Sequence, residues 1–296
     1  MTESHADPAY VGADRGGAAP GYAPGRTLGF WVEVRRQLGR RRTLGVFAFM
    51  AVLPLILILA FAIGNPADLG RQSTVNLIDV ATSGSLNFML FVFFVTTGFF
   101  LVIVFALFFG DTVASEAGWG SLRYLLAIPV PRSRLLARKL FVALFLSLAA
   151  LLTLIAVSLL AGWICYGWHP VDTPVGIELS TGAAAWRVAL IAAYIAANMI
   201  MVGGLAFYLS VRTDAPLAAV GGTVFIVIVS SILGQVEALG NLRNWLPTQY
   251  NFAWVGMLGV PPDTSQMIRG VSYAFAYAAI LFALAFRHFY KKDITS

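Results

Sequence analysis

Residues 110–139 read GDTVASEAGWGSLRYLLAIPVPRSRLLARK, and they lie between two apolar runs, Phe88–Phe109 and Leu140–Trp163. The stretch contains two acidic residues, four Arg and one Lys, whereas neither run contains a charged residue. A basic connection between two uncharged runs is typical of a loop at a membrane surface. The rest of the chain can be placed relative to this segment.

The stretch also has a local structural pattern. Apolar residues recur at roughly helical spacing from Val113 to Leu126. Pro129 and Pro131 should end that helix, because proline lacks an amide donor and disfavours helix in the preceding residue. Ser133 can then cap a second, basic helix that leads into the next apolar run. The prediction is a compact helix, corner and helix suited to docking on another protein; the alternative is an ordinary basic loop.

The composition indicates a membrane protein. The 296 residues are 59% hydrophobic and 11% charged, with a mean hydropathy of +0.80, which lies far from soluble averages. The length is better counted in bilayer crossings of about 20 residues each. The single Cys165 excludes an intramolecular disulfide and a cysteine metal cluster. We therefore predict an all-α integral membrane protein whose main environment is the lipid bilayer.

The chain begins with two segments of different character. Residues 1–26 are rich in Gly, Ala and Pro and are predicted to be a disordered cytoplasmic tail. Within 27–43, Glu33, Arg36 and Gln37 share one helical face, and apolar residues including Trp31 cover the opposite side. This pattern predicts an amphipathic helix lying on the cytoplasmic leaflet as an elbow before the first span. The alternative is a plain basic flank that orients that span.

Residues 44–290 are predicted to form the transmembrane domain, followed by a cytoplasmic C-terminus at 291–296. Six runs are long enough to cross a hydrocarbon core of about 30 Å, and we place them near 44–63, 88–109, 140–163, 188–211, 215–234 and 270–286. The pairs Gly203-Gly204 and Gly221-Gly222 predict close approach between helices.

The basic residues predict the orientation of the spans. If the N-terminus lies inside, the outer side holds only four of the 20 Lys and Arg residues: Arg71, Arg187, Arg243 and Arg269. This asymmetry favours cytoplasmic location of both termini in a cell membrane, and it ties the net charge of +6 to the membrane rather than to nucleic acid.

The last outer connection, 235–269, is long and unusually apolar. Its apolar stretches are too short to span, which predicts helices that re-enter the outer leaflet. The alternative is a belt of aromatic residues at the membrane surface.

The sequence offers little for catalysis. It contains neither a phosphate-binding GxxxxGK[ST] pattern nor an HExxH zinc pattern, and its three His residues lie outside the spans. Asp111 at a span end lacks the second embedded carboxylate that aspartyl chemistry would need. We expect neither an enzyme nor a metal site. Among the polar residues of the spans, Asn198, Thr96 and Thr97 are candidates for lining a substrate path, although such residues often only join helices.

The order of residues in 110–139 resembles the loop between the second and third spans of type-2 ABC exporter permeases. That loop runs as an acidic residue, a Gly-Ser or Gly-Thr pair, leucines, Pro-Val-x-Arg and then a Lys entering a helix. The matching residues are Glu116, Gly120, Ser121, Leu122, Leu125, Leu126, Pro129, Val130, Arg132 and Lys139. Pro131 and Trp119 depart from the usual pattern.

The resemblance implies the membrane subunit of an ATP-binding-cassette exporter. It would pair with a second copy, identical or related, and with nucleotide-binding subunits that hold ATP and Mg, while this chain binds no cofactor. The residues implied in coupling to the ATPase subunit are Glu116, Gly120, Ser121, Leu122, Tyr124, Leu125, Pro129, Arg132 and Arg134. The re-entrant segment would close the outer end of the path, with candidate gate residues Gln235, Glu237, Trp245 and Tyr250.

The cargo implied is amphipathic or lipid-like, such as a drug, a peptide antibiotic or a glycolipid. The alternative is a self-standing carrier or channel without an ATPase. Such carriers commonly use ionisable groups at mid-membrane, and the uncharged runs count against this alternative.

Overall fold

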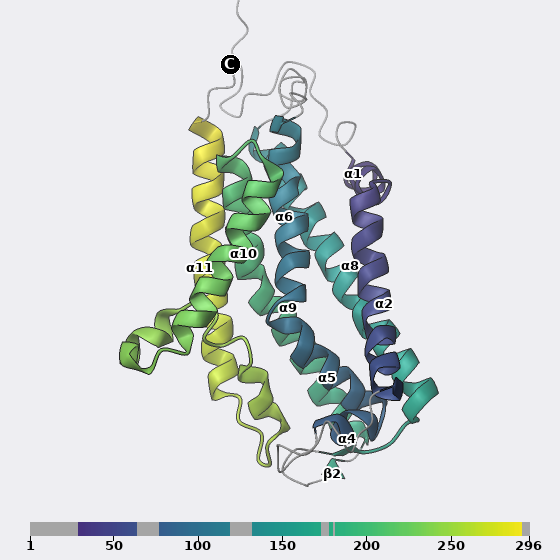
Figure 1. Ribbon diagram of the computed structural model, residues 1–296. Coiled ribbons are helices and arrows are strands. Elements are labelled where there is room, and N and C mark those ends of the chain that lie inside the picture. Colours follow the sequence, from purple (N-terminus) through teal and green to yellow (C-terminus); the bar gives the residue numbers. More distant parts are fainter. Residues whose placement is uncertain (1–28, 64–76, 119–131, 173–177, 180, 292–296) are drawn as a thin grey trace, which may run out of the picture.

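The computed structural model describes residues 29–63, 77–118, 132–172, 178–179 and 181–291 (Figure 1). In this part of the chain six helices are long and apolar enough to cross a membrane. They are α2 Arg41–Ile63, α6 Phe100–Gly118, α8 Arg132–Tyr166, α9 Thr181–Arg212, α10 Pro216–Gly234 and α11 Ser265–Lys291. The prediction of an all-α multi-pass membrane protein is confirmed.

The second predicted span, 88–109, is not one continuous helix. It is divided into α5 (Ser85–Thr97) and α6, with Gly98 and Phe99 between them. Two local features favour the break: the Thr96 hydroxyl donates to the Val92 carbonyl at 2.7 Å, and a Cβ at Gly98 would lie 3.3 Å from the Phe252 ring. A threonine that bonds back to its own helix often bends it.

The predicted helix beginning near Val113 is also corrected. α6 continues without interruption to Gly118, so Asp111 and Glu116 belong to the second span's own helix. The two-proline corner lies outside the described residues. At its far side, the basic helix and the third span form the single 35-residue helix α8.

The elbow helix is present but shorter than 27–43. α1 covers Phe30–Leu38 and ends at Gly39, and the arginines Arg41 and Arg42 already belong to α2. In Figure 1, α1 caps the upper end of α2. It packs against both α2 and α8.

Helix α9 forms the centre of the bundle, since it packs against α6, α10 and α11. At this crossing the Phe109 ring of α6 meets Phe207 of α9 and Phe282 of α11. A Cβ at Gly203 would lie 2.8 Å from the Phe109 ring, so the prediction of close approach is confirmed at this glycine. It is wrong at Gly221, where a Cβ would meet nothing within 4 Å among the described residues.

The long outer connection folds back beside the bundle. It contains two short 3₁₀ helices, η1 Glu237–Trp245 and η2 Ala253–Leu258, and η2 packs against α9 and α11. In Figure 1 the segment leaves the lower end of α10 and lies beside the lower half of α11. The segment is therefore helical and too short to cross, as predicted, and its re-entry into the membrane stays a prediction.

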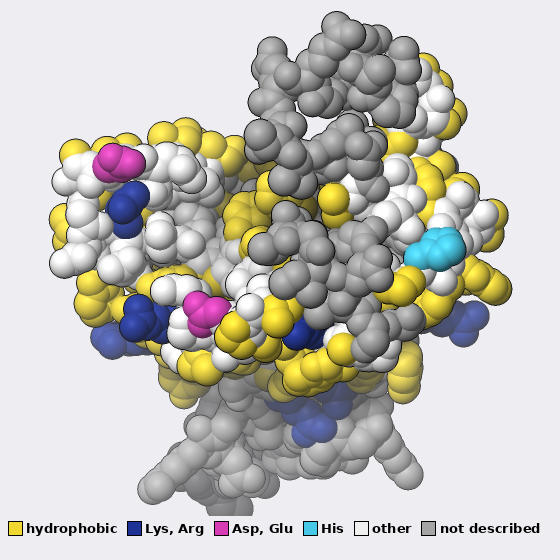
Figure 2. All heavy atoms as spheres, turned by 90° about the horizontal axis from the view of Figure 1, so that it is seen from below, with side chains coloured by type: hydrophobic (Ala, Val, Ile, Leu, Met, Phe, Trp, Pro, Cys, Tyr) yellow, Lys and Arg dark blue, Asp and Glu magenta, His cyan; other side chains and the backbone are white. Residues whose placement is uncertain are grey.

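The same lower end of the bundle carries the other short elements. They are α4 (Leu77–Thr82) and two strands, β1 (Val171–Asp172) and β2 (Glu178–Leu179), which pair antiparallel. Figure 2 shows this end from below, where a few charged side chains are scattered among hydrophobic ones. The remaining parts of the two shorter outer connections lie outside the described residues.

The glycine contrast predicts a difference in stability. Gly203→Val should lower the free energy of unfolding by about 1–3 kcal/mol, because the new side chain overpacks a ring that neighbouring rings hold in place. Gly221→Val should change it much less. Thermal unfolding of both purified variants in the same detergent measures the difference; equal melting temperatures would contradict the packing described for α6 and α9.

Candidate functional site

Four charged side chains join α1, α6 and α8 at the end of the bundle that is uppermost in Figure 1, which we call the base. These side chains form the basal ion network: Glu33 and Arg36 of α1, Glu116 of α6 and Lys139 of α8. Lys139 Nζ lies 2.5 Å from Glu116 Oε2 and 4.0 Å from Glu33 Oε1. Arg36 forms ion pairs with both Glu33, at 2.8 Å, and Glu116. The network ties the elbow helix to the second and third spans.

The centre of the network is buried. The Glu116 and Lys139 side chains are only 2% and 4% exposed, respectively. Removing two charges from water is costly unless each finds a close opposite charge and further hydrogen bonds. Lys139 obtains one such bond by donating to the Thr112 carbonyl at 3.5 Å. The carboxylate and the ammonium therefore depend on each other in this packing.

Glu33 is held ionised by the same cations. Burial by itself would raise the pKa of this carboxyl, but the charges of Lys139 and Arg36 and hydrogen bonds from Arg36 and Gln37 outweigh it, and the pKa lies below its ordinary value. For Arg36, burial works against the charge, but the hydrogen bond to Glu116 and the nearby carboxylates raise the pKa of the guanidinium. The elbow is thus charged on its inner side at neutral pH.

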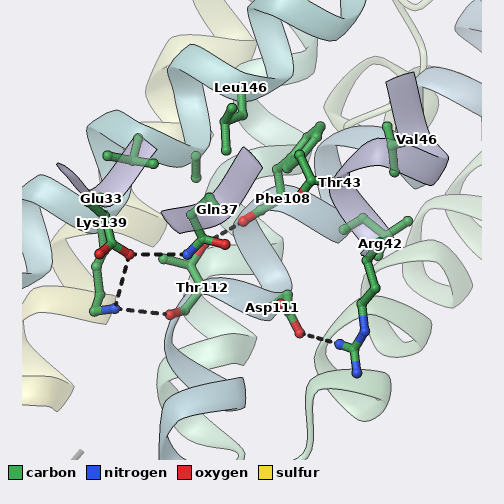
Figure 3. A pocket seen from close by; sticks show the side chains of 13 residues that line it. Glu33, Gln37, Arg42, Thr43, Val46, Phe108, Asp111, Thr112, Lys139 and Leu146 are labelled. Atoms are coloured by element: carbon green, nitrogen blue, oxygen red, sulfur yellow. Dashed lines mark hydrogen bonds and ion pairs between the residues drawn. The ribbon is translucent and has the colours of Figure 1, made fainter. Parts of the chain in front are cut away.

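A second ion pair group lies beside the network (Figure 3). Asp111 of α6 receives hydrogen bonds from Arg40 at 3.1 Å and from Arg42 at 2.8 Å. Between the two groups is a cavity of about 20 Å³, lined by polar residues such as Gln37 and Thr112 and by apolar residues of α8. This volume is enough for about one water molecule. Ion pairs on two sides of α6 therefore join it to its neighbours: Glu116 pairs with Lys139 of α8, and Asp111 pairs with Arg40 and with Arg42 of α2.

The end of α6 is also fixed to α9. The Ser210 hydroxyl accepts hydrogen bonds from the backbone amides of Val113 and Ala114, at 3.1 and 3.0 Å. A Cβ at Gly118 would lie 2.7 Å from the Asp214 carbonyl oxygen, in the turn between α9 and α10. Displacement of the α6 terminus would therefore be transmitted to α1, α8 and α9 together.

A second polar group lies deeper in the bundle. Asn198 of α9 donates to the Tyr194 hydroxyl at 3.4 Å, and that hydroxyl donates to the Tyr250 carbonyl of the outer segment. The Asn198 side-chain oxygen is buried without a hydrogen-bond partner in the described part of the chain. We call Asn198, Tyr194 and Tyr250 the outer polar chain. This chain connects Asn198, a candidate for the substrate path, with Tyr250, a candidate for the outer gate.

The family of the chain can be stated at this point. The model of the family described as "Protein of unknown function (DUF2705)" matches residues 48–295. The chain belongs to the DUF2705 family. The match begins at Ala48 within α2 and covers the other five spans in full, so Glu33 and Arg36 lie outside it. No curated protein matches the chain.

Of the coupling residues predicted for this DUF2705 chain, the structure describes the side chains of Glu116 and Arg134. Gly120, Ser121, Leu122, Tyr124, Leu125 and Pro129 lie outside the described residues, as does the Arg132 side chain, although Arg132 begins α8. Arg134 is half-buried in the first turns of α8. Glu116 is turned into the basal ion network, where its side chain is 2% exposed.

The four gate candidates are not equivalent. Tyr250 is buried and stacks on Tyr273 of α11 with ring centroids 5.5 Å apart. Trp245 is exposed, although its ring meets Tyr273 at 5.8 Å. Gln235 and Glu237 are exposed near the start of the segment. Only Tyr250 among them joins the outer polar chain.

The path candidates on α5 are buried. The Thr96 hydroxyl is used by its own helix, as described above, whereas the Thr97 hydroxyl is buried without a hydrogen-bond partner in the described residues. Neither threonine has a hydrogen bond to Asn198 among those described. The structure therefore does not join the three path candidates into one group.

The sequence pattern did not identify two residues of the site, and it did not give the direction of one helical face. Tyr194 and Arg187 were not singled out as site residues, yet Arg187 donates at 3.0 Å to the carbonyls of both Met257 and Gly259 and so anchors the outer segment. The polar face of the elbow points inward, because Glu116 and Lys139 attract it. Its apolar residues Trp31 and Val32 point outward. The repeat of Glu33, Arg36 and Gln37 located this face but not its direction.

Breaking the buried pair should destabilise the protein. Glu116→Gln leaves the buried Lys139 with only a carboxylate 4.0 Å away, and Lys139→Met leaves the buried Glu116 with only the half-exposed Arg36, so each should cost up to about 3–5 kcal/mol. The double variant should lose less unfolding free energy than the sum of the two single losses, because it removes both members of the pair. Unfolding free energies of the four proteins measure the coupling; strictly additive losses would contradict a direct pair.

The lowered pKa of Glu33 predicts a pH dependence. Because the folded pKa lies below the unfolded value of about 4.3, the stabilisation by this carboxylate is complete above that value and is lost as pH falls through the folded pKa. The difference in melting temperature between wild type and Glu33→Gln should therefore shrink at acidic pH. Glu237→Gln on the exposed outer segment is the matched control, and a constant difference for Glu33→Gln would refute its ion pairing.

Proposed function

We propose that this chain is the transmembrane permease subunit of an ATP-binding-cassette exporter. It works with a second permease copy and with nucleotide-binding subunits that hydrolyse ATP with Mg. The cargo is an amphipathic or lipid-like molecule that moves outward across the cell membrane. Both termini lie in the cytoplasm, so the basal ion network lies at the cytoplasmic side.

The main support for this proposal is the set of buried ion pairs between the helices on either side of residues 119–131. The helices that enter and leave this connection, α6 and α8, are joined to each other and to α1 by the buried pair Glu116–Lys139 and by Arg36. A force applied between α6 and α8 would therefore move several elements as one unit. Rigid-body switching requires such an element.

The sequence of the connection supplies the second support. Its Gly-Ser pair, leucines and Pro-Val pair lie in the sequence between α6 and α8, and Arg132 of the Pro-Val-x-Arg order begins α8. Leu122, Tyr124 and Leu125 would bury surface against the nucleotide-binding subunit. Arg134, in the first turns of α8, would orient the contact.

Helix α9 connects the base of the bundle with the outer segment. This helix bonds to α6 at its base through Ser210 and to the outer segment through Tyr194. A movement of the base can thus reach the segment that contains Tyr250 through one continuous helix. In this proposal the outer segment opens when α9 is displaced.

The decisive experiment is purification of the tagged full chain from native membranes in mild detergent, followed by identification of co-purifying ATP-binding subunits. Leu125→Asp should reduce the recovered ATPase about tenfold or more, since it removes an apolar contact worth about 1.5–3 kcal/mol and adds a charge. Ala215→Asp is the matched control: it adds the same charge in an exposed turn at the same end, at a helix N-cap that accepts Asp.

Both variants should still insert in the membrane and melt like wild type. Equal recovery of the ATPase with Leu125→Asp would remove the coupling assignment. Transport by the purified chain alone in liposomes, unaffected by ATP, would identify a self-standing carrier or channel instead.

A further inference from the structure

An apolar groove lies between the elbow helix and the outward face of α8. Its volume is about 370 Å³, and its lining is Phe30, Arg138, Phe141, Leu144, Phe145 and Leu148. Five of these six side chains are apolar, and the volume falls in the range of about 300–1,000 Å³ typical of small-ligand sites. This groove is separate from the basal ion network and from the outer polar chain.

The groove faces away from the bundle. Phe141 and Phe145 are 57% and 38% exposed, whereas their neighbours Val142 and Leu146 are buried against Val34 of α1. In a membrane-spanning helix, an outward face meets acyl chains rather than water. A concave apolar surface in this position is suited to a lipid chain.

The charged end of the groove is cationic. Arg138 lies one turn before Phe141 on the same face of α8, and Arg134 lies one turn earlier still. Arg35 on the neighbouring elbow is exposed. The groove thus combines an apolar body with a positive end.

Aromatic side chains form the wall on the side of the elbow. Phe30, Trp31 and Phe145 meet edge to face in all three pairs, with ring centroids 5.6–5.8 Å apart. Trp31 is nevertheless 69% exposed, which suits a residue at the level of lipid headgroups. The wall fixes the groove at the boundary between hydrocarbon and headgroups.

We infer that this groove binds a phospholipid with an anionic headgroup. One acyl chain lies along Phe141, Phe145 and Leu148, and the headgroup phosphate is held at Arg138. The elbow helix contributes Phe30 as the opposite wall, so the bound lipid also holds α1 against α8. This inference needs only the membrane location of the chain, and it stands independently of the proposed transport function.

The test uses the full chain in detergent and native mass spectrometry, with dioleoyl phosphatidylglycerol or dioleoyl phosphatidylcholine added to the same micelles. Wild type should retain phosphatidylglycerol in preference to phosphatidylcholine. Arg138→Gln should weaken retention of phosphatidylglycerol about fivefold, the effect of about one basic residue on binding to an anionic lipid. Arg212→Gln, which removes an exposed arginine at the same end of the bundle, should leave retention unchanged.

A second variant tests the apolar part. Leu148→Trp should fill the groove and lower the retention of both lipids. Equal retention by wild type and Arg138→Gln, equal retention of the two lipids by wild type, or unchanged retention by Leu148→Trp would overturn the inference. So would a dimer that Leu148→Trp disrupts without any loss of lipid, because a second copy would then occupy the groove.

A third measurement does not depend on the folding of these variants. Phosphatidylglycerol with brominated acyl chains should quench tryptophan fluorescence more in wild type than in Trp31→Phe, because Trp31 borders the groove. Brominated phosphatidylcholine should show a smaller difference between the two proteins. The same quenching in wild type and Trp31→Phe would overturn the placement of the chain.

Discussion

The arrangement of the base depends on one buried pair of opposite charges, Glu116 and Lys139. Each side chain is the closest fully buried partner of the other, and burying a charge without such a partner is costly. The pair brings α6 and α8 together at one end of the bundle, and Arg36 joins the elbow to them. The direction of α1, with its polar face inward and its apolar face toward lipid, follows from this requirement.

That direction explains how two unrelated features share one short helix. The inner face of α1 completes the basal ion network, while its outer face supplies Phe30 and Trp31 to the groove beside α8. An amphipathic helix on a free surface would turn its charges to water. In this protein the buried charges of α6 and α8 replace water as the better partner, so the outer face of the helix is left for lipid.

The sequence was sufficient for features that depend on composition and period. Six apolar runs, an elbow and an outer segment too short to cross follow from hydropathy, and all are present. It was insufficient where a tertiary contact decides. The break between α5 and α6 depends on Phe252, more than 150 residues away, and the inward turn of Glu116 depends on Arg36 and Lys139. Gly221 resembles Gly203 in the sequence, yet only Gly203 meets a neighbouring helix.

The candidate site shows the same division. The residue types of the connection between α6 and α8 support a resemblance, but they do not reveal that Glu116 faces inward. This difference changes the role of Glu116 in the proposed exporter: a buried carboxylate shared by a lysine and an arginine cannot also be the contact with a partner. It can instead make α1, α6 and α8 respond together, and the contact then falls to the leucines of the connection.

The two ends of the bundle differ in the kind of bond that holds them, and this difference bears on how movement could pass between them. The base is held by ion pairs, whereas the outer segment is held by two hydrogen bonds from Arg187 to carbonyls, by one from Tyr194 and by ring stacking at Tyr250. A hydrogen bond from the neutral Tyr194 contributes about 0.5–1.5 kcal/mol, and one from the charged Arg187 about 1.5–3 kcal/mol. The break at Gly98 lies between the two ends and against Phe252. In the proposed exporter, a displacement applied at the base would therefore leave the charged cluster intact and separate the contacts of the outer segment first.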